Sequence, residues 1–142
     1  MLVHCLYASR PAPALSAGSI DAILQTSRRK NAGAGITGAL CYTDDVFLQV
    51  LEGGRDAVCD LYNTIVCDER HQDVRMLVFA EISARRFSAW SMGQIDLSRV
   101  NPGLLLKHSE LPKLNPFAMP GHATMALLDE LVSSAAIISK ST

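Results

Sequence analysis

Residues 36–53 read ITGALCYTDDVFLQVLEG, and the rest of the chain is predicted to be organised around them. Two runs rich in β-branched and aromatic residues flank the polar cluster at 43–45, which predicts a β-hairpin with its turn at the two aspartates. Alternate side chains of the second arm fall on opposite faces: Val46, Leu48 and Val50 on one, and Phe47, Gln49 and Leu51 on the other. Both faces are mostly apolar, so this arm is predicted to be a central strand that is covered on both sides.

Gln49 is the polar exception on this arm. A buried amide without hydrogen-bond partners costs about 1–3 kcal/mol, judged from mutational data. A partner for its side chain is therefore expected from the layer that packs against that face.

The composition limits the class of protein. The chain has 142 residues, a net charge of −1, 19% charged residues and a mean hydropathy of +0.18, which predicts one folded domain. Its cationic residues are scattered except at 28–30, so nucleic-acid binding is not expected. No segment approaches the ~18 apolar residues of a membrane span, and a soluble, cytoplasmic protein is expected. The cysteines lack metal-type spacing, so reduced thiols and no metal site are predicted.

The elements expected before residue 97 alternate between strands and helices. They are a strand at 2–7, a helix at 16–31, the hairpin at 36–53, a helix at 55–67, a strand at 74–82 and a short strand at 90–95. The order is βαββαβ with an additional fifth strand. Short connections and right-handed crossovers then place both helices on one sheet face, which is an α+β, ferredoxin-like fold.

The rest of the chain is expected to cover the second sheet face. Residues 101–121 contain four prolines and are predicted to be an irregular connector. Residues 122–139 have a helical pattern, and this helix is expected to pack on the sheet or on another subunit. Its apolar stripe is Met125, Leu128, Leu131, Val132, Ala135 and Ile138.

Polar side chains converge on the layer between the sheet and the two helices. The stripe of the first helix runs from Ile20, Ile23 and Leu24 to two polar residues, Ser27 and Asn31. Together with Tyr7 and Gln49, these two side chains suggest a site that binds a flat or mostly apolar ligand. The alternative is that they satisfy one another or the nearby backbone. No Walker loop, GxGxxG, GxSxG or HExxH motif is present, so the chain is not expected to be an enzyme.

Six segments, taken in order, resemble the BLUF family of blue-light sensors that use FAD, over roughly residues 1–97. They are LVHCLYAS (2–9), TSRRKN (26–31), ITGAL (36–40), FLQVLEG (47–53), DERH (68–71) and RRFSAWSM (85–92). The chain therefore divides, on this resemblance, into a flavin-binding domain at 1–97 and a connector with a helical cap or output segment at 98–142.

The resemblance implies an FAD whose ring lies between the two helices, against the sheet. Tyr7 becomes the light-reactive tyrosine and Gln49 the switching glutamine, while Asn31 bonds the polar edge of the ring. The remaining cofactor-binding residues that it implies are Ile23, Ser27, Lys30, Phe47, Ile65, Arg70 and His71.

The resemblance also implies a mechanism. Light drives electron and proton transfer from Tyr7 to the flavin, and the hydrogen bonds centred on Gln49 are left rearranged. The last strand carries the signal through Trp90 or Met92, which the alternation of a strand places on one shared face. Output passes to the C-terminal helix and a separate effector protein, and a homo-oligomer is expected.

Two other functions fit the residues. One is a ferredoxin-like module that binds another small ligand without photochemistry, with Gln49 as a recognition group. The other is a flavin-dependent or acylphosphatase-like enzyme, which the missing phosphate loop disfavours.

Overall fold

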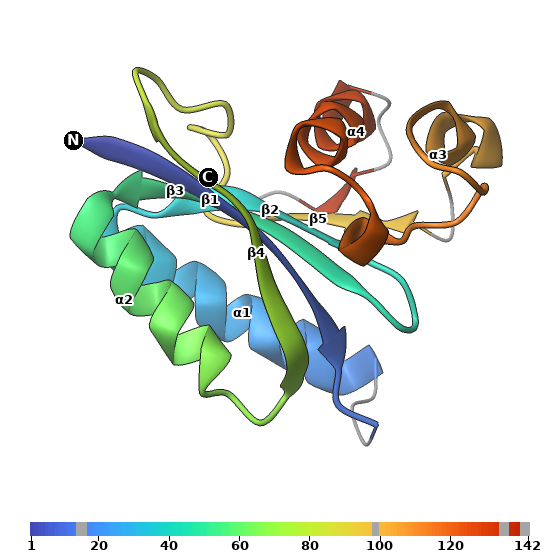
Figure 1. Ribbon diagram of the computed structural model, residues 1–142. Helices are drawn as coiled ribbons and strands as arrows, with labels where there is room; N and C mark the ends of the chain where they lie inside the picture. The colour runs from blue at the N-terminus through green and yellow to red at the C-terminus, as the bar shows by residue number, and fades with distance from the viewer. Residues whose placement is uncertain (14–16, 98–99, 134–136, 140–142) are drawn as a thin grey trace.

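A computed structural model describes residues 1–13, 17–97, 100–133 and 137–139, and it contains a six-stranded sheet with helices on both faces (Figure 1). The strands are β1 (Leu2–Pro11), β2 (Thr37–Tyr42), β3 (Phe47–Gly54), β4 (His71–Ile82), β5 (Gly93–Asp96) and β6 (Ile137–Ser139). The helices are α1 (Ala17–Ala34), α2 (Arg55–Val66), α3 (Pro102–His108) and α4 (Gly121–Ser133), with a 3₁₀ turn at Pro116–Ala118.

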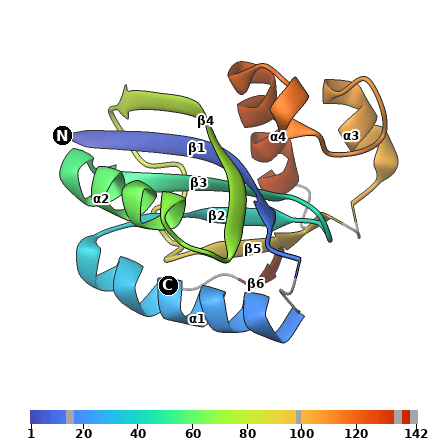
Figure 2. The ribbon, with the colours of Figure 1, turned by 60° about the horizontal axis from the view of Figure 1, so that its bottom comes forward.

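The strands lie side by side in the order β4-β1-β3-β2-β5-β6, which Figure 2 shows. β1 is antiparallel to β3 and to β4, whereas β2 is antiparallel to β3 and parallel to β5. The first four strands with α1 and α2 therefore form the predicted ferredoxin-like βαββαβ unit, and β5 is the predicted fifth strand.

The predicted hairpin is confirmed as β2 and β3. The two strands are joined at Tyr42 and Phe47, and the backbone N–H of Thr43 donates to the carbonyl of Val46 at 2.9 Å. The strands approach closely at Gly38, where a Cβ would lie 2.0 Å from the Val50 carbonyl oxygen. Only glycine fits at that point of the sheet.

Two buried layers lie on opposite faces of the sheet. In Figure 1, α1 and α2 lie below the sheet and α3 and α4 above it. The predicted alternation along β3 is confirmed, because Phe47 and Leu51 pack in the α1–α2 layer while Leu48 and Val50 pack in the α3–α4 layer.

α1 and α2 follow their sequence signals where these are described. α2 buries Val58 and Ile65, and the apolar residues Leu61 and Tyr62 of the same helix are half-buried. α1 ends at Ala34 and is followed by Gly35, which has a φ of +72°. The N–H of Ile36 donates to the carbonyl of Asn31 at 2.9 Å. This is a Schellman-type helix end that favours glycine. Ser16 and the side chains of Ile20 and Leu24 lie outside the described part.

The C-terminal region corrects two predictions. Residues 101–121 are not irregular throughout, because Asn101 caps the short helix α3 by accepting from the N–H of Gly103 at 2.9 Å. The helix predicted to reach Ser139 ends at Ser133, and residues 137–139 form β6 against β5. The strand forms here because backbone pairing with β5 overrides the helical pattern.

α4 covers the second sheet face, which is one of the two arrangements expected from the sequence. Its apolar side chains are buried with those of the sheet: Met125, Leu127, Leu128 and Leu131, with Val132 partly buried. Ala135 lies outside the described residues, and Ile138 belongs to β6. Across the described ranges, no helix has both the length and the apolar character that crossing a membrane requires.

Candidate functional site

A cavity of about 110 Å³ lies between the sheet and the two helices α1 and α2. Its lining comes from α1, α2, the central strands and the turn before β4. All ten residues that the sequence analysis proposed for cofactor binding line it: Tyr7, Ile23, Ser27, Lys30, Asn31, Phe47, Gln49, Ile65, Arg70 and His71. The structure therefore brings these side chains together around one space.

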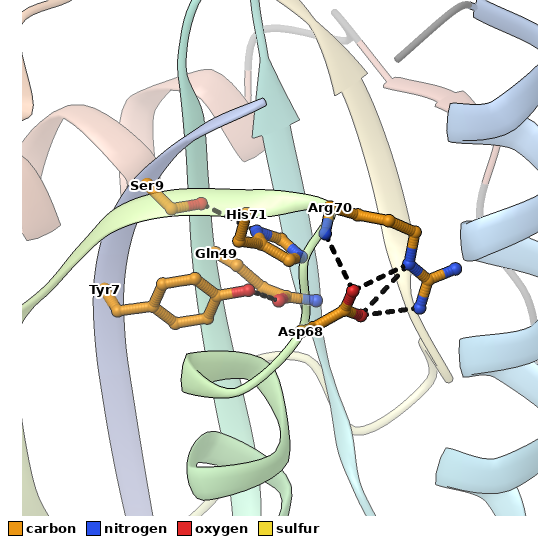
Figure 3. Close-up of polar contacts among 6 residues, drawn as sticks. All are labelled: Tyr7, Ser9, Gln49, Asp68, Arg70 and His71. Atoms are coloured by element: carbon orange, nitrogen blue, oxygen red, sulfur yellow. Dashed lines mark hydrogen bonds and ion pairs between the residues drawn. The ribbon is translucent and has the colours of Figure 1, made fainter. Parts of the chain in front are cut away.

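Tyr7 and Gln49 are direct neighbours on β1 and β3, so their side chains lie next to each other on the same sheet face. The Tyr7 hydroxyl donates to Gln49 Oε1, as Figure 3 shows. Burial strongly raises the pKa of Tyr7, whose side chain is fully buried, so its hydroxyl remains a protonated donor. Tyr7 is thus the partner that a buried amide at position 49 requires.

The other half of the Gln49 amide contacts Met92. Gln49 Nε2 donates to Met92 Sδ at 3.2 Å, and Met92 is fully buried. The Met92 carbonyl in turn accepts from Arg28 Nε on α1 at 3.1 Å. Met92 is therefore linked both to the buried amide and to the helix that forms one wall of the cavity.

Trp90 lies on the other side of the sheet from Met92, so the prediction that the two share one face is wrong. Trp90 packs in the α3–α4 layer with its ring 5.4 Å from that of Phe87. The strand begins only at Gly93, and strand alternation therefore does not apply to residues 90–92. Gly93 makes room for the indole, since a Cβ there would lie 2.4 Å from Trp90 Cε3.

Asn31 carries a buried donor for which the described part of the chain provides no acceptor. The residue is 2% exposed, and no described residue accepts a hydrogen bond from its Nδ2. Leaving a buried donor unsatisfied costs about 1–3 kcal/mol. Because Asn31 lines the cavity, its amide is suited to bind an acceptor on a ligand, such as a carbonyl or ring nitrogen at the edge of a flavin. Ser27 and Lys30 line the same side, with Lys30 exposed.

The turn between α2 and β4 places a fixed cation beside the cavity. Arg70 Nη2 lies 2.6 Å from Asp68 Oδ2, and the Arg70 backbone N–H donates to Asp68 Oδ1 at 2.9 Å (Figure 3). Hydrogen bonding from Arg70 lowers the pKa of the Asp68 carboxyl. About half of the Arg70 side chain is exposed, so the guanidinium is oriented and still accessible to an anionic or hydroxyl-rich group.

His71 supplies a polar but uncharged part of the lining. Its Nδ1 forms a 2.8 Å hydrogen bond with Ser9 Oγ, and burial lowers its pKa, which favours the neutral ring. The ring is tilted against Phe47, with centroids 5.2 Å apart. Phe47 and Ile65 are buried apolar walls of the cavity.

Several lining residues were not proposed as site residues from the sequence: Thr26, Leu40, Leu61, Thr64 and Asp68. Leu40 lies opposite Gln49 in the β2–β3 register, so the hairpin alone places it near the site. Arg28 was missed because its bond to the Met92 carbonyl joins segments 64 residues apart. Within the part of the chain that the structure describes, no group of three or more His, Cys, Asp or Glu side chains is placed to hold a metal ion.

Comparison with known proteins gives a consistent result. The family model described as sensors of blue-light using FAD, abbreviated BLUF, matches residues 2–93. The photoactivated adenylate cyclase subunit beta of Euglena longa is 39% identical over 92 residues, which is 64% of this chain and 10% of that protein. The chain thus spans about a tenth of the length of the first curated relatives it matches.

Two solved structures resemble the whole fold. The photo-activated state of BlsA is 29% identical with a TM-score of 0.86, and the match covers 100% of this chain and 99% of that one. The dark state of BlrB, a BLUF protein, is 31% identical with a TM-score of 0.78, over 94% of this chain and 96% of that one.

Proposed function

The chain belongs to the BLUF family of blue-light sensors that use FAD, and from that premise we propose that it binds FAD in the cavity between α1 and α2 and responds to light through Tyr7 and Gln49. The observation that carries the proposal is the pair of buried contacts of Gln49, which accepts from the Tyr7 hydroxyl and donates to Met92 Sδ.

The residues present fit a flavin. Asn31 offers a buried donor to the polar edge of the ring, with Ser27 and Lys30 beside it. Ile23, Phe47 and Ile65 would contact its apolar faces, while Arg70 and His71 would border the ribityl and phosphate portion. When bound, the flavin would supply blue-light absorption and a strongly oxidising excited state.

Tyr7 is arranged to release an electron and a proton together. Its raised pKa disfavours loss of a proton alone, because a phenolate would be uncompensated in this buried position. Its hydroxyl proton already points to Gln49 Oε1. The Gln49 amide has both acceptor and donor atoms, so it can take up that proton at Oε1 and release one from Nε2 to an acceptor in the cavity.

The contact between Gln49 and Met92 is suited to switching. A thioether sulfur is a weak acceptor, so Nε2 loses little when it exchanges Met92 for a stronger acceptor in the cavity. Met92 lies directly before β5 and its carbonyl is held by Arg28. A rearranged amide at position 49 would therefore change the contact with Met92, which helps to fix the start of β5.

We further propose that the output is a protein contact in trans and that the chain catalyses no reaction. Trp90 packs in the same layer as α4, which supports a route from the switch to the C-terminal segment. In this proposal residues 1–97 sense light, residues 98–142 pass the signal on, and the protein works as a homo-oligomer. Its cytoplasmic location stays a prediction.

The test is an absorption spectrum of the purified protein before and after blue light, followed through dark recovery. We expect a flavin spectrum that shifts slightly to the red without bleaching and then returns. Gln49→Leu should keep the flavin and lose the shift, whereas Gln94→Leu is a matched control. Gln94 is 8% exposed against 7% for Gln49, but its Nε2 donates to Tyr42 and not to the Tyr7 pair.

Other outcomes separate the alternatives. A purified protein that is colourless and takes up no flavin would favour a small-ligand module without photochemistry. A flavin that bleaches to a reduced form and stays reduced would favour redox chemistry instead. A full red shift in Gln49→Leu would refute the role of the glutamine.

A further inference from the structure

Glu52 is a fully buried carboxylate outside the cavity. It lies on β3, on the same strand face as Leu48 and Val50, toward the α3–α4 layer. Its Oε2 accepts from the backbone N–H of Arg86 at 2.7 Å, and its Oε1 accepts from the N–H of Phe87 at 3.0 Å. A buried charge needs such donors, and here two of them come from consecutive residues of one loop.

The same loop is attached to the sheet at further points. Thr37 Oγ1 donates to Glu52 Oε1 at 2.9 Å, and Arg85 Nη1 donates to Thr37 Oγ1 at 3.0 Å. Residues 85–87 are thus held on β2 and β3 through a set of bonds centred on the Glu52 carboxylate.

The segment that follows this loop connects it to the Tyr7–Gln49 pair. The Trp90 N–H donates to the Phe87 carbonyl at 2.9 Å, and the Trp90 carbonyl accepts from the N–H of Gly38 at 3.1 Å. Met92 follows two residues later and accepts from Gln49. A displacement at Met92 therefore reaches the Glu52 attachment through a short, hydrogen-bonded segment.

The loop is also joined to α4. Arg86 Nη1 lies 2.7 Å from both carboxylate oxygens of Asp129, and the two side chains are 48% and 47% exposed. Arg86 thus contacts Glu52 through its backbone and α4 through its side chain. Arg86 therefore connects the sheet, the loop and α4.

We propose that Glu52 is a positioning residue that couples the Gln49–Met92 contact to α4 by holding the 85–87 loop. Two consecutive N–H groups on one carboxylate give the loop a single position. A shift of Trp90 then changes the hydrogen bonds between this loop and Glu52. Arg86 moves as a result, and its ion pair with Asp129 transmits the movement to α4. The light-dependent part of this inference rests on the proposed function, but the attachment itself does not.

The test uses the full chain with flavin bound and measures amide hydrogen exchange in the dark and under blue light. Glu52→Gln replaces one acceptor oxygen by an NH₂ group that faces a backbone donor. We expect the amides of Arg86 and Phe87 to exchange at least about tenfold faster in the dark, since a hydrogen bond to a charged group is lost. The red shift should persist, and the light-induced change in α4 exchange should be lost.

Two further variants make the result specific. Glu81→Gln is the matched control, because this carboxylate on β4 is exposed and pairs with Arg55 at the surface; it should leave both readouts unchanged. Asp129→Asn cuts the exposed ion pair with α4 without altering a buried group. It should keep the slow exchange of the 86 and 87 amides and reduce the α4 response at least about twofold.

The outcomes separate the two proposals. If the wild type shows no reversible red shift, the proposed function fails. If the wild type shifts and Glu52→Gln still gives an α4 response of wild-type size, the coupling role of Glu52 is refuted. Should Glu52→Gln fail to fold, Asp129→Asn decides, because an undiminished α4 response in that variant would overturn the route through Arg86.

Discussion

The two layers on either side of the sheet differ in how they treat buried polar groups. In the α3–α4 layer the buried polar side chains Glu52 and Thr124 bond to backbone groups of the protein. In the α1–α2 layer Gln49 and Asn31 face a cavity, and Asn31 Nδ2 has no acceptor among the described residues. The strand β3 serves both layers through alternate residues.

The contrast separates a packed core from a binding site within one fold. Satisfied polar groups among apolar side chains stabilise an arrangement, whereas a donor left without a partner beside a cavity is suited to a ligand. The α3–α4 layer thus holds the sheet, and the α1–α2 layer is the candidate site. Four substitutions test whether the two layers differ in this way.

The largest effect is expected from Tyr7→Phe in the α1–α2 layer. It removes the hydroxyl that donates to Gln49 and leaves the ring volume nearly unchanged, so flavin should bind while the light-induced red shift is abolished. Tyr62→Phe is the control, since that ring lies 5.8 Å from Tyr7 on α2. Difference spectra under blue light measure both, and a normal response in Tyr7→Phe would contradict the role of this hydroxyl.

In the α3–α4 layer, Leu128→Ala should reduce stability and spare the light response. Leu128 is fully buried, so the cavity it leaves should lower the free energy of unfolding by about 2–5 kcal/mol. Leu106→Ala, at a residue 52% exposed, should change it by less than about 0.5 kcal/mol. Denaturant unfolding gives these values, and loss of the red shift in folded Leu128→Ala would show that the layers are not separable.

Asn31→Leu should change ligand affinity and apoprotein stability in opposite directions. The apoprotein loses an unsatisfied buried donor and should be as stable or slightly more stable, whereas flavin should bind about tenfold more weakly because a hydrogen bond is lost. Titration with flavin and denaturant unfolding measure the two effects. Asn63→Leu, at an exposed position of α2, should alter neither affinity nor the light response. Unchanged flavin affinity in Asn31→Leu would remove Asn31 from the site.

The smallest effect concerns pH. Burial lowers the pKa of His71 below the ordinary value of 6.5, so the unfolded chain binds a proton that the folded state rejects. The contribution of neutral His71 to the free energy of unfolding is complete above pH 6.5. It is lost as the pH falls through the lowered pKa of the folded state. His71→Gln should therefore reduce the loss of apoprotein stability between about pH 7.5 and 5.5.

Another histidine contributes to the same slope. His4 has a pKa lowered mainly by burial, so part of the slope should remain in His71→Gln. An identical slope in His71→Gln and wild type would contradict burial of a neutral ring at position 71.

Most of the fold could be predicted from periodicity, because residues 46–51 alternate cleanly and α2 has a complete apolar stripe. The helix α3 was missed although Asn101 and Pro102 are a cap and a first-turn proline, since seven residues are too few to show a period. β6 was mistaken for helix because its pairing with β5 depends on backbone contact between distant segments.

The site shows the same limit. The residues around the cavity could be proposed from a buried glutamine, a polar helix stripe and a family resemblance, all of which are present in the sequence. The opposite orientations of Trp90 and Met92 could not be predicted, because they depend on an irregular segment before Gly93. The contacts of Arg28 and Glu52 likewise join segments that only the fold brings together.

The position of α4 also has a consequence for synthesis of the chain. The sheet face that it covers is built from strands that all precede Leu97, apart from β6. At ~5–20 residues per second, a ribosome needs about 2–7 seconds to add the residues from there to Ser133. During that interval the nascent sheet exposes Leu48, Val50 and their neighbours, so a chain stalled before Gly121 would be a substrate for chaperones or would aggregate.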